Sequence, residues 1–292
     1  MPFFSIIIPT YNRGALIGKT IQSILSQTFV DYEIIIVDDG STDNTEEIIK
    51  SVKSEKIILI KQKNNERGAA RNAGTKKANG TYITFLDSDD VFYPNHLQIA
   101  HNTIKNNLNP EVFHTRYEII KEDGQVIEQK KLLTKKINKN LISGNFMSCN
   151  GVFLRKDIAL ANLFNEDRAL SALEDWELWL RIASKYSIIY SNTITSAIIN
   201  HDSRSVLNTN KADLILRIET LLKYVLSNSQ IISYYKHEIS KFKSSCYTYI
   251  ALHLALTKNN RIDAIKFLIK GLRENNSAVF TRRFYAIIKH LI

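Results

Sequence analysis

The tetrapeptide at residues 87–90, Asp-Ser-Asp-Asp, carries the side chains best suited to chemistry in this chain. Residues two apart in an extended backbone point to the same side, so Asp87 and Asp89 can face one point. Paired carboxylates are the ligands with which Mg²⁺ or Mn²⁺ bridges a protein and substrate phosphates. A polar turn that caps the next helix is the alternative. The apolar run TYITFL directly before the motif places it at the end of a buried strand and favours the metal.

A second acidic motif, Asp38 and Asp39 followed by Gly40, also comes after a solid apolar run. Gly40 permits a sharp turn into the next predicted helix. A carboxylate at this point can accept hydrogen bonds from a nucleobase N–H or a ribose hydroxyl. Helix capping explains Ser41 and the polar residues after it, but it does not require two aspartates.

Two arginines, Arg67 and Arg71, lie four residues apart and so share one face of a predicted helix. In that position Arg71 can meet a diphosphate, because a guanidinium matches the geometry of phosphate oxygens. A solvated arginine is the open alternative.

Glu174 and Asp175 begin another predicted helix. Acidic residues at a helix start complement the helix dipole and cap free N–H groups, and the pair taken alone fits that structural role. Trp176 and Trp179 fall on the apolar stripe of this helix, so we expect them to pack rather than to stack on a sugar. His201, after an apolar run, fits a surface loop when judged by residue type alone.

Residues 14–20, GALIGKT, come close to a phosphate-binding P-loop, but only three residues separate the two glycines where the pattern needs four. The segment also lies in a helical pattern. The first strand is not followed by GxGxxG, the signature of a dinucleotide-binding fold. ATP and NAD are therefore not the expected ligands.

Short apolar runs alternate with helical patterns over the first hundred residues. This alternation predicts an α/β fold with a mostly parallel sheet flanked by helices on both faces. Ligands of such sheets bind at the carboxyl ends of the strands, where the polar loops fall. Strands are predicted at residues 3–8, 33–37, 56–60, 81–86, 112–120, 151–155 and 194–199.

The chain of 292 residues is 44% hydrophobic and 23% charged, which is enough for about two domains and too apolar for a disordered chain. Its two cysteines, Cys149 and Cys246, are too few for a disulfide framework and lack zinc-site spacing. The N-terminus lacks a signal peptide, and no apolar stretch approaches the ~18 residues of a membrane span. These features predict a cytoplasmic protein.

The net charge of +10 is concentrated near the C-terminus: residues 1–201 carry +1 and residues 202–292 carry +9. We therefore predict a first domain over 1–201 and a basic, helical C-terminal region over 202–292. The last helical pattern, residues 280–291, has an apolar face among basic residues. Such a helix either lies on an anionic membrane, peripherally at its inner face, or packs on the protein.

The order and spacing of these motifs resemble the cytoplasmic bacterial family 2 glycosyltransferases, which have the GT-A fold. The resemblance covers roughly residues 3–201. It implies inverting transfer of a sugar from a nucleotide diphosphosugar, usually a UDP-sugar, to an acceptor hydroxyl in surface polysaccharide or lipid-linked oligosaccharide assembly. The segments that carry it are FSIIIPTYNRG, EIIIVDDGSTDNT, NNERGAARNAGTKKANGTYITFLDSDD and LEDWELWLRI.

The same resemblance assigns the nucleotide site. It implies that Pro9, Tyr11 and Asp39 hold the nucleobase and ribose and that Arg71 lies near the nucleotide. Asp87, the first residue of the family's DxD motif, belongs to the same group of contacts.

The resemblance also assigns the metal and the base. It implies that Asp89 is the metal partner of the DxD motif, for Mg²⁺ or Mn²⁺, and that Asp175 matches the catalytic base. Some relatives use a histidine in the region of His201 to touch the metal or diphosphate, which makes His201 a further metal candidate.

Two other classes of protein remain open. A nucleotidyltransferase can use a similar sheet and carboxylate site, but it needs a Gly-rich loop after the first strand, where only Gly14 occurs. A non-catalytic nucleotide-binding or nucleic-acid-binding protein accounts for the charge. It does not need the acidic motifs, and the basic excess avoids the part of the chain that carries them. The expected partners are a nucleotide-sugar donor and a saccharide or lipid-linked acceptor, not nucleic acid.

Overall fold

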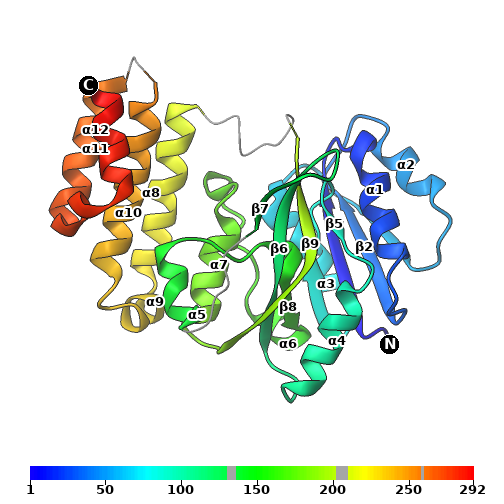
Figure 1. The fold of residues 1–292 in the computed structure, drawn as a ribbon. Helices are drawn as coiled ribbons and strands as arrows, with labels where there is room; N and C mark the ends of the chain where they lie inside the picture. Colours follow the sequence, from blue (N-terminus) through cyan, green and yellow to red (C-terminus); the bar gives the residue numbers. More distant parts are fainter. Residues whose placement is uncertain (130–135, 202–209, 258–259) are drawn as a thin grey trace.

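The computed structural model describes residues 1–129, 136–201, 210–257 and 260–292. These residues form a nine-stranded mixed sheet with helices on both faces, and the C-terminal helices gather at one end of the molecule (Figure 1). The strand order is β3-β2-β1-β4-β8-β6-β9-β5, with β7 paired to β6. The strands are β1 (Phe4–Thr10), β2 (Tyr32–Asp38), β3 (Ile57–Lys61), β4 (Tyr82–Phe85), β5 (Val91–Phe92), β6 (Val112–Lys121), β7 (Val126–Gln129), β8 (Val152–Arg155) and β9 (Ile188–Asn200).

Strands β3, β2, β1 and β4 are parallel, which confirms the arrangement predicted from the alternating pattern. Every residue of β1 and β2 is buried, as solid apolar runs require when both faces of a strand are covered. Thr10 at the end of β1 pairs with Asp38 at the end of β2. The polar loops that follow these strands therefore meet at one edge of the sheet.

Beyond β4 the sheet is mixed. Strand β8 is antiparallel to β4 and β6, whereas β9 is parallel to β6 and antiparallel to β5. The two-residue strand β5 directly follows the acidic motif and pairs with Ser196 and Ala197 near the end of β9. This pairing brings the end of β9 beside the acidic motif.

Helices cover the sheet in two layers. Helices α1 and α4 pack on one face with residues such as Ile21 and Leu97, and α3, α6 and α7 pack on the other with residues such as Ala70 and Leu178. The α-helices are α1 (Gly14–Leu25), α2 (Thr45–Ser51), α3 (Glu66–Lys77), α4 (His96–Asn106), α5 (Ile137–Asn140), α6 (Lys156–Ala161), α7 (Glu174–Ala183), α8 (Lys211–Ser227), α9 (Ser229–Tyr234), α10 (Ile239–Ala255), α11 (Arg261–Glu274) and α12 (Arg282–Leu291). The described 3₁₀ helices are η1 (Leu141–Ser143), η2 (Cys149–Gly151), η3 (Arg168–Leu170) and η5 (Asn276–Phe280).

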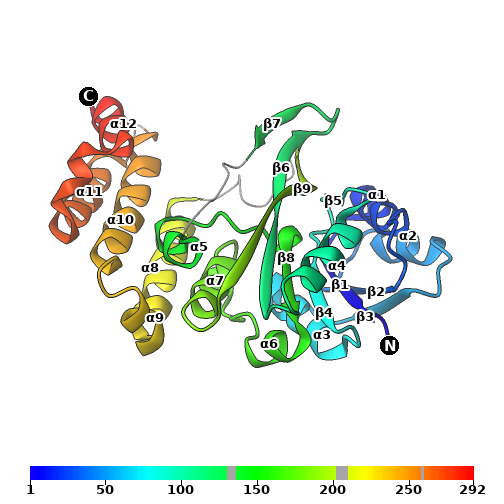
Figure 2. The same ribbon diagram turned by 60° about the horizontal axis from the view of Figure 1, so that its bottom comes forward.

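The C-terminal helices share a continuous hydrophobic core with the α7 face of the sheet. Trp176 of α7 lies edge-on to Phe242 of α10, with ring centroids 5.6 Å apart, so the predicted packing role of this tryptophan is confirmed. Figure 2 shows α8 between α7 and the outer helices. Residues 202–209, where we predict the boundary of the C-terminal region, lie outside the described residues, and the division at 201 stays a prediction.

Helix α12 packs its apolar face inward. Ile287 is fully buried, and Phe284, Ile288 and Leu291 pack against the shared core. Packing therefore accounts for the apolar residues of α12, whereas Phe280, which precedes this helix in η5, is 82% exposed. Among the described residues, no helix is both long enough and apolar enough to cross a membrane.

Candidate active site

A cleft of about 460 Å³ opens at the carboxyl ends of β1, β2 and β4. Five of the residues predicted to bind the nucleotide or the metal line this cleft, and they come from the ends of β1, β2 and β4 and the loops that follow them. They are Pro9, Tyr11, Asp39, Asp87 and Asp89. The structure therefore brings together residues that are up to 80 positions apart in the sequence.

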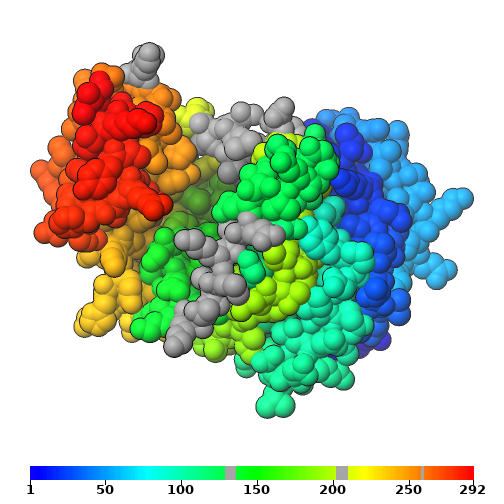
Figure 3. Space-filling model, viewed as in Figure 1, coloured from blue at the N-terminus to red at the C-terminus, as the bar shows by residue number. Residues whose placement is uncertain are grey.

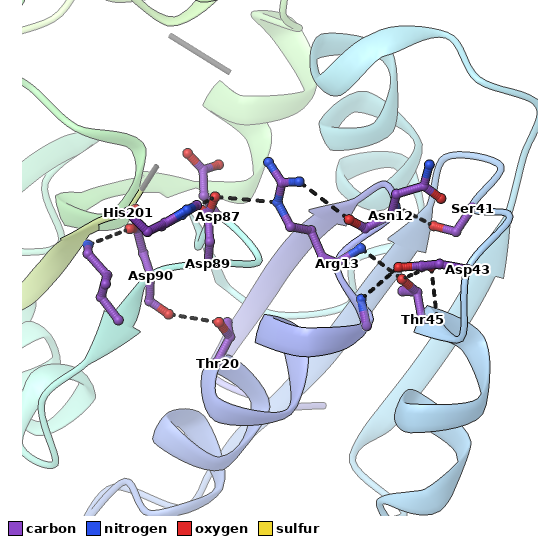
Figure 4. Close-up of polar contacts among 12 residues, drawn as sticks. Asn12, Arg13, Thr20, Ser41, Asp43, Thr45, Asp87, Asp89, Asp90 and His201 are labelled. Carbon is purple, nitrogen blue, oxygen red and sulfur yellow. Dashed lines mark hydrogen bonds and ion pairs between the residues drawn. The ribbon is translucent and has the colours of Figure 1, made fainter. Parts of the chain in front are cut away.

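The loops after β1 and β2 are tied together where they form one wall of the site (Figure 4). The backbone N–H of Asn12 donates to Ser41 Oγ at 2.9 Å, and the N–H of Gly14 donates to Asp43 Oδ2 at 3.0 Å. A Cβ at Gly14 would lie 1.9 Å from Asn44 Oδ1, so a larger residue here would displace the Asn44 side chain where the loops meet. Gly14 begins α1, which confirms that residues 14–20 lie in a helix rather than a phosphate loop.

The two aspartates at the end of β2 have different partners. Asp38 Oδ1 accepts from the backbone N–H of Ser41 at 2.9 Å and so closes its own turn. Asp39 faces the cleft, and its Oδ1 accepts from Gln62 Nε2 at 2.7 Å and from the N–H of Asn65 at 2.9 Å. Burial raises the pKa of Asp39, and the two hydrogen bonds only partly oppose that rise.

The carboxylates of the acidic motif also divide their roles. Asp87 Oδ1 accepts from Arg71 Nη2 at 2.6 Å. Asp89 Oδ2 lies 3.2 Å from His201 Nε2 and 3.5 Å from Arg13 Nε (Figure 4). Asp87 thus faces the α3 side of the site, and Asp89 faces both the end of β9 and the loop after β1.

Asp90, the last residue of the motif, holds the loop in place. It is 1% exposed, and its Oδ1 accepts from the N–H of Ile199 in β9 at 3.0 Å while its Oδ2 accepts from Asn150 Nδ2 at 3.2 Å. The hydroxyl of Thr20 in α1 donates to its carbonyl oxygen. The loop that carries Asp89 is therefore fixed to both β9 and α1.

Arg71 lies behind the cleft wall. It is 1% exposed, and its guanidinium joins Asp87 to Glu174 Oε1, the latter at 2.8 Å from Nη1. A direct contact between Arg71 and the nucleotide stays a prediction. Two other arginines, Arg13 and Arg67, line the cleft, with side chains 22% and 28% exposed.

Asp175 begins α7 and is partly buried. Its Oδ2 accepts from Asn145 Nδ2 at 3.0 Å, and its Oδ1 accepts from the N–H of Trp176 at 2.6 Å. Burial first, and then the charge of Glu174, raise the pKa of Asp175 to about 7, against the opposing effects of Arg71 and the two hydrogen bonds. A carboxylate with this pKa can take a proton at neutral pH.

The acidic motif offers donor groups suited to a divalent cation. Among the described residues, no group of three or more His, Cys, Asp or Glu side chains could hold a metal ion. Asp89 and His201 nevertheless converge within hydrogen-bond distance. Two protein ligands fit Mg²⁺ or Mn²⁺ in a site where substrate phosphates and waters supply the remaining ligands.

Sequence reasoning missed Arg13 and Asn145. Arg13 lies inside the motif PTYNRG, which follows a predicted strand, and this position could have identified it as a candidate site residue. Asn145 falls in an irregular segment between η1 and η2, where no periodicity points to its contact with Asp175.

The mixed sheet, with its acidic cleft at the carboxyl ends of the parallel strands, has the GT-A fold. Residues 5–164 match the family model described as "Glycosyl transferase family 2", and the chain belongs to that family. The match ends before α7 and the end of β9.

Several relatives extend this likeness. The chain is 32% identical over 254 residues to the Escherichia coli "UDP-Glc:alpha-D-GlcNAc-diphosphoundecaprenol beta-1,3-glucosyltransferase WfaP", covering 85% of this chain and 98% of that protein. It is 35% identical over 238 residues to an "Uncharacterized glycosyltransferase" of Rickettsia bellii, covering 78% of this chain. The chain spans only 33% of that relative and 47% of a similar one from Rickettsia conorii.

Solved structures share the fold. A structure titled "S. aureus TarS 1-349 in complex with UDP-GlcNAc" superposes with a TM-score of 0.73 at 19% identity, covering 100% of this chain and 88% of that one. A mannosyltransferase from Pyrobaculum calidifontis "in complex with GDP-Man and Mn2+" has a TM-score of 0.59 at 15% identity, covering 94% of this chain and 87% of that one.

Proposed function

We propose that this protein transfers a sugar from a UDP-sugar to a hydroxyl of a lipid-linked saccharide, with inversion at the anomeric carbon and with Asp175 as the general base. The observation that carries the proposal is Asp175 itself. Its pKa of about 7 suits proton abstraction at neutral pH. The neighbouring Glu174 is engaged by Arg71 and is not available for that task.

The donor fits the cleft at the carboxyl ends of β1 and β2. Asp39 and Tyr11 hold the nucleobase and ribose, beside Pro9. Arg13 and Arg67 supply positive charge for the diphosphate, because both line the same cleft. Asp87 is held on the other side of the cleft by Arg71.

A divalent cation fits between the acidic motif and the diphosphate. Asp89 and His201 would hold Mg²⁺ or Mn²⁺, which supplies neutralising charge to the departing nucleoside diphosphate. Arg13, 3.5 Å from Asp89, adds positive charge at the same point.

The reaction is a single displacement. Asp175 accepts the proton of the acceptor hydroxyl as its oxygen forms a bond to the anomeric carbon. The bond from that carbon to the phosphate oxygen breaks, and the nucleoside diphosphate leaves with the electron pair. Proton removal and departure occur at opposite ends of one in-line reaction, so holding both partners in one site supplies much of the rate.

The choice of donor and acceptor is supported by the relatives. The E. coli relative is named for UDP-Glc as donor and a diphosphoundecaprenol-linked sugar as acceptor, and it aligns with 85% of this chain. The S. aureus structure with the same fold contains UDP-GlcNAc. Both point to a uridine donor, although the Pyrobaculum structure contains GDP-Man.

The test is a transfer assay with UDP-Glc, UDP-GlcNAc and GDP-Man, each with Mn²⁺ and with excess chelator, on a GlcNAc-diphospholipid acceptor. We expect a uridine donor to give product, and NMR of the new linkage to show an anomeric configuration opposite to that of the donor. Retained configuration would overturn the single displacement. Binding of UDP without transfer to any acceptor would favour a nucleotide-binding protein instead.

A further inference from the structure

Helix α11 has a buried apolar side and, next to it, a second apolar stripe that is exposed. Ala264, Leu268 and Gly271 are buried on the side that faces α10. The two helices approach closely, since a Cβ at Gly271 would lie 2.8 Å from Thr248 Cγ2 of α10. A helix packed in this way needs apolar residues on one side only.

The second stripe of α11 carries three isoleucines that are exposed to solvent. Ile262 is 72% exposed, Ile265 is 44% exposed and Ile269 is 45% exposed. Their spacing of three and four residues places them in one stripe. Helices α11 and α12 form the end of the molecule farthest from β1–β3, and Figure 3 shows both at the surface.

Basic side chains flank the isoleucine stripe. Lys266 and Arg273 follow Ile262 by four and eleven residues, so they lie along the same side of the helix, and both are exposed. The two acidic residues of α11 have basic partners. The carboxylate of Asp263 lies 2.5 Å from Lys211 Nζ and 3.1 Å from Nζ of the exposed Lys266, and the carboxylate of Glu274 lies 2.6 Å from Lys243 Nζ.

The neighbouring helix α12 also has an exposed side that carries basic residues. Its apolar side is buried, whereas its outer side carries Arg282, Tyr285 and Lys289, with Tyr285 62% exposed. Residues 261–292 contain seven Lys and Arg against two acidic residues. Exposed apolar and aromatic side chains among basic ones are the composition of a surface that binds an anionic lipid interface.

We propose that the outer sides of α11 and α12 dock this protein on an anionic phospholipid surface. The isoleucines enter the apolar boundary of the lipid, and the basic residues contact the head groups. A second copy of this chain fits this surface less well, because the basic surfaces of the two copies would repel each other. The docking does not depend on the cleft. Only its purpose, to keep the enzyme beside a lipid-linked acceptor, rests on the proposed function.

The test is cosedimentation of the full chain with phosphatidylcholine vesicles, with and without phosphatidylglycerol, at low and high salt. We expect binding that requires phosphatidylglycerol and weakens in high salt. The double variant Lys266→Glu with Arg273→Glu should lower vesicle affinity by at least about 25-fold, at about fivefold for each basic residue removed from the surface. The triple variant Ile262→Gln, Ile265→Gln and Ile269→Gln should lower it by about tenfold or more.

Two control variants match these changes elsewhere on the surface. Lys76→Glu with Lys77→Glu makes the same change in net charge at the end of α3, and the triple change of Val30, Leu108 and Leu160 to Gln removes three other exposed apolar side chains. The apolar control should bind vesicles with an affinity within about twofold of the wild type. Both controls should bind far more tightly than the Lys266 and Arg273 variant.

Three results would overturn the proposal. The first is that the chain does not bind phosphatidylglycerol vesicles at low salt. The second is that the α11 variants and their controls lose binding equally. The third is that light scattering shows a dimer, which the isoleucine variant abolishes without any effect on vesicle binding. UDP binding, measured on every variant in solution, separates this proposal from the proposed function. It should stay unchanged in all of them, because every substituted residue lies outside the cleft.

Discussion

Arg71 and Glu174 form an ion pair of 2.8 Å in which the side chains are only 2% and 5% exposed. The pair gives the two adjacent acidic residues at the start of α7 separate roles. Glu174 neutralises a buried guanidinium, and Asp175 keeps a raised pKa. The same guanidinium also holds Asp87, so one buried arginine positions groups from the loop after β4 and from α7.

We expect Asp175→Asn to lower kcat by about 10²–10⁴-fold, the usual contribution of a general base, because the amide cannot take the acceptor's proton. UDP affinity should stay within a few-fold of the wild type. Transfer kinetics and isothermal titration with UDP check the two halves of this prediction. A nearly full kcat would return Asp175 to the role of a helix cap.

Asp89→Asn should instead weaken UDP binding in Mn²⁺ and leave the fold intact, since this carboxylate lies in a strand-end loop and not in the core. Titration of UDP in Mn²⁺ and in excess chelator provides the measurement. Unchanged affinity in Mn²⁺, or full activity in chelator, would remove Asp89 from the metal site.

The rate should depend on pH through Asp175. With a pKa of about 7, the base is protonated at lower pH, so kcat/KM should fall about tenfold per pH unit below that value. Asn145→Ala removes a hydrogen bond that favours the charged carboxylate, so the fall should begin at higher pH. The activity that the Asn145→Ala variant loses at pH 7 should return at pH 9. Asn102→Ala, at an exposed position on α4, is the control and should leave the profile in place.

Glu174→Ala should lower the free energy of unfolding by about 3 kcal/mol or more, because it removes one partner of a buried charge. Urea unfolding measures the loss. Glu46→Ala removes a carboxylate that pairs with two lysines on the surface, and its effect should be much smaller. Equal losses in the two variants would mean that the buried pair contributes no more than a surface pair.

Two buried histidines make the fold sensitive to acid. Burial lowers the pKa of His96 and of His114 from 6.5 to about 3, so below pH 6.5 the unfolded chain binds protons that the folded chain does not. Stability should therefore fall as the pH drops from 6.5 toward 3, by up to about 1.4 kcal/mol per pH unit for each histidine. Urea unfolding at pH 7 and pH 5 tests this. A His114→Phe variant should show a shallower dependence if the assignment is correct.

The parallel half of the sheet could be predicted from the sequence because its strands are solid apolar runs. The ends of these runs placed Asp39 and Asp87 at one edge of the predicted sheet. The mixed half could not be ordered in the same way. Strands β8, β6 and β9 pair in an order set by tertiary packing, and periodicity within a strand carries no information about its neighbour.

The contacts between distant parts of the site could not be predicted from the sequence either. The spacing of Arg67 and Arg71 predicted one helix face, but only the packing of α3 against α7 shows that Arg71 is buried and Arg67 is in the cleft. Asn145 reaches Asp175 from an irregular segment, where neither period nor composition distinguishes it from other asparagines.

The pairing of β5 with the end of β9 has a consequence for synthesis on the ribosome. Asp89 and His201 are separated by 112 positions, and they meet only when β9 has been added beside β6. The parallel strands β1–β4, whose carboxyl ends line the cleft, leave the ribosome long before that. A nascent chain can thus form the β1–β4 side of the cleft while Asp89 and His201 are still apart, and the last step in bringing them together is the arrival of one strand.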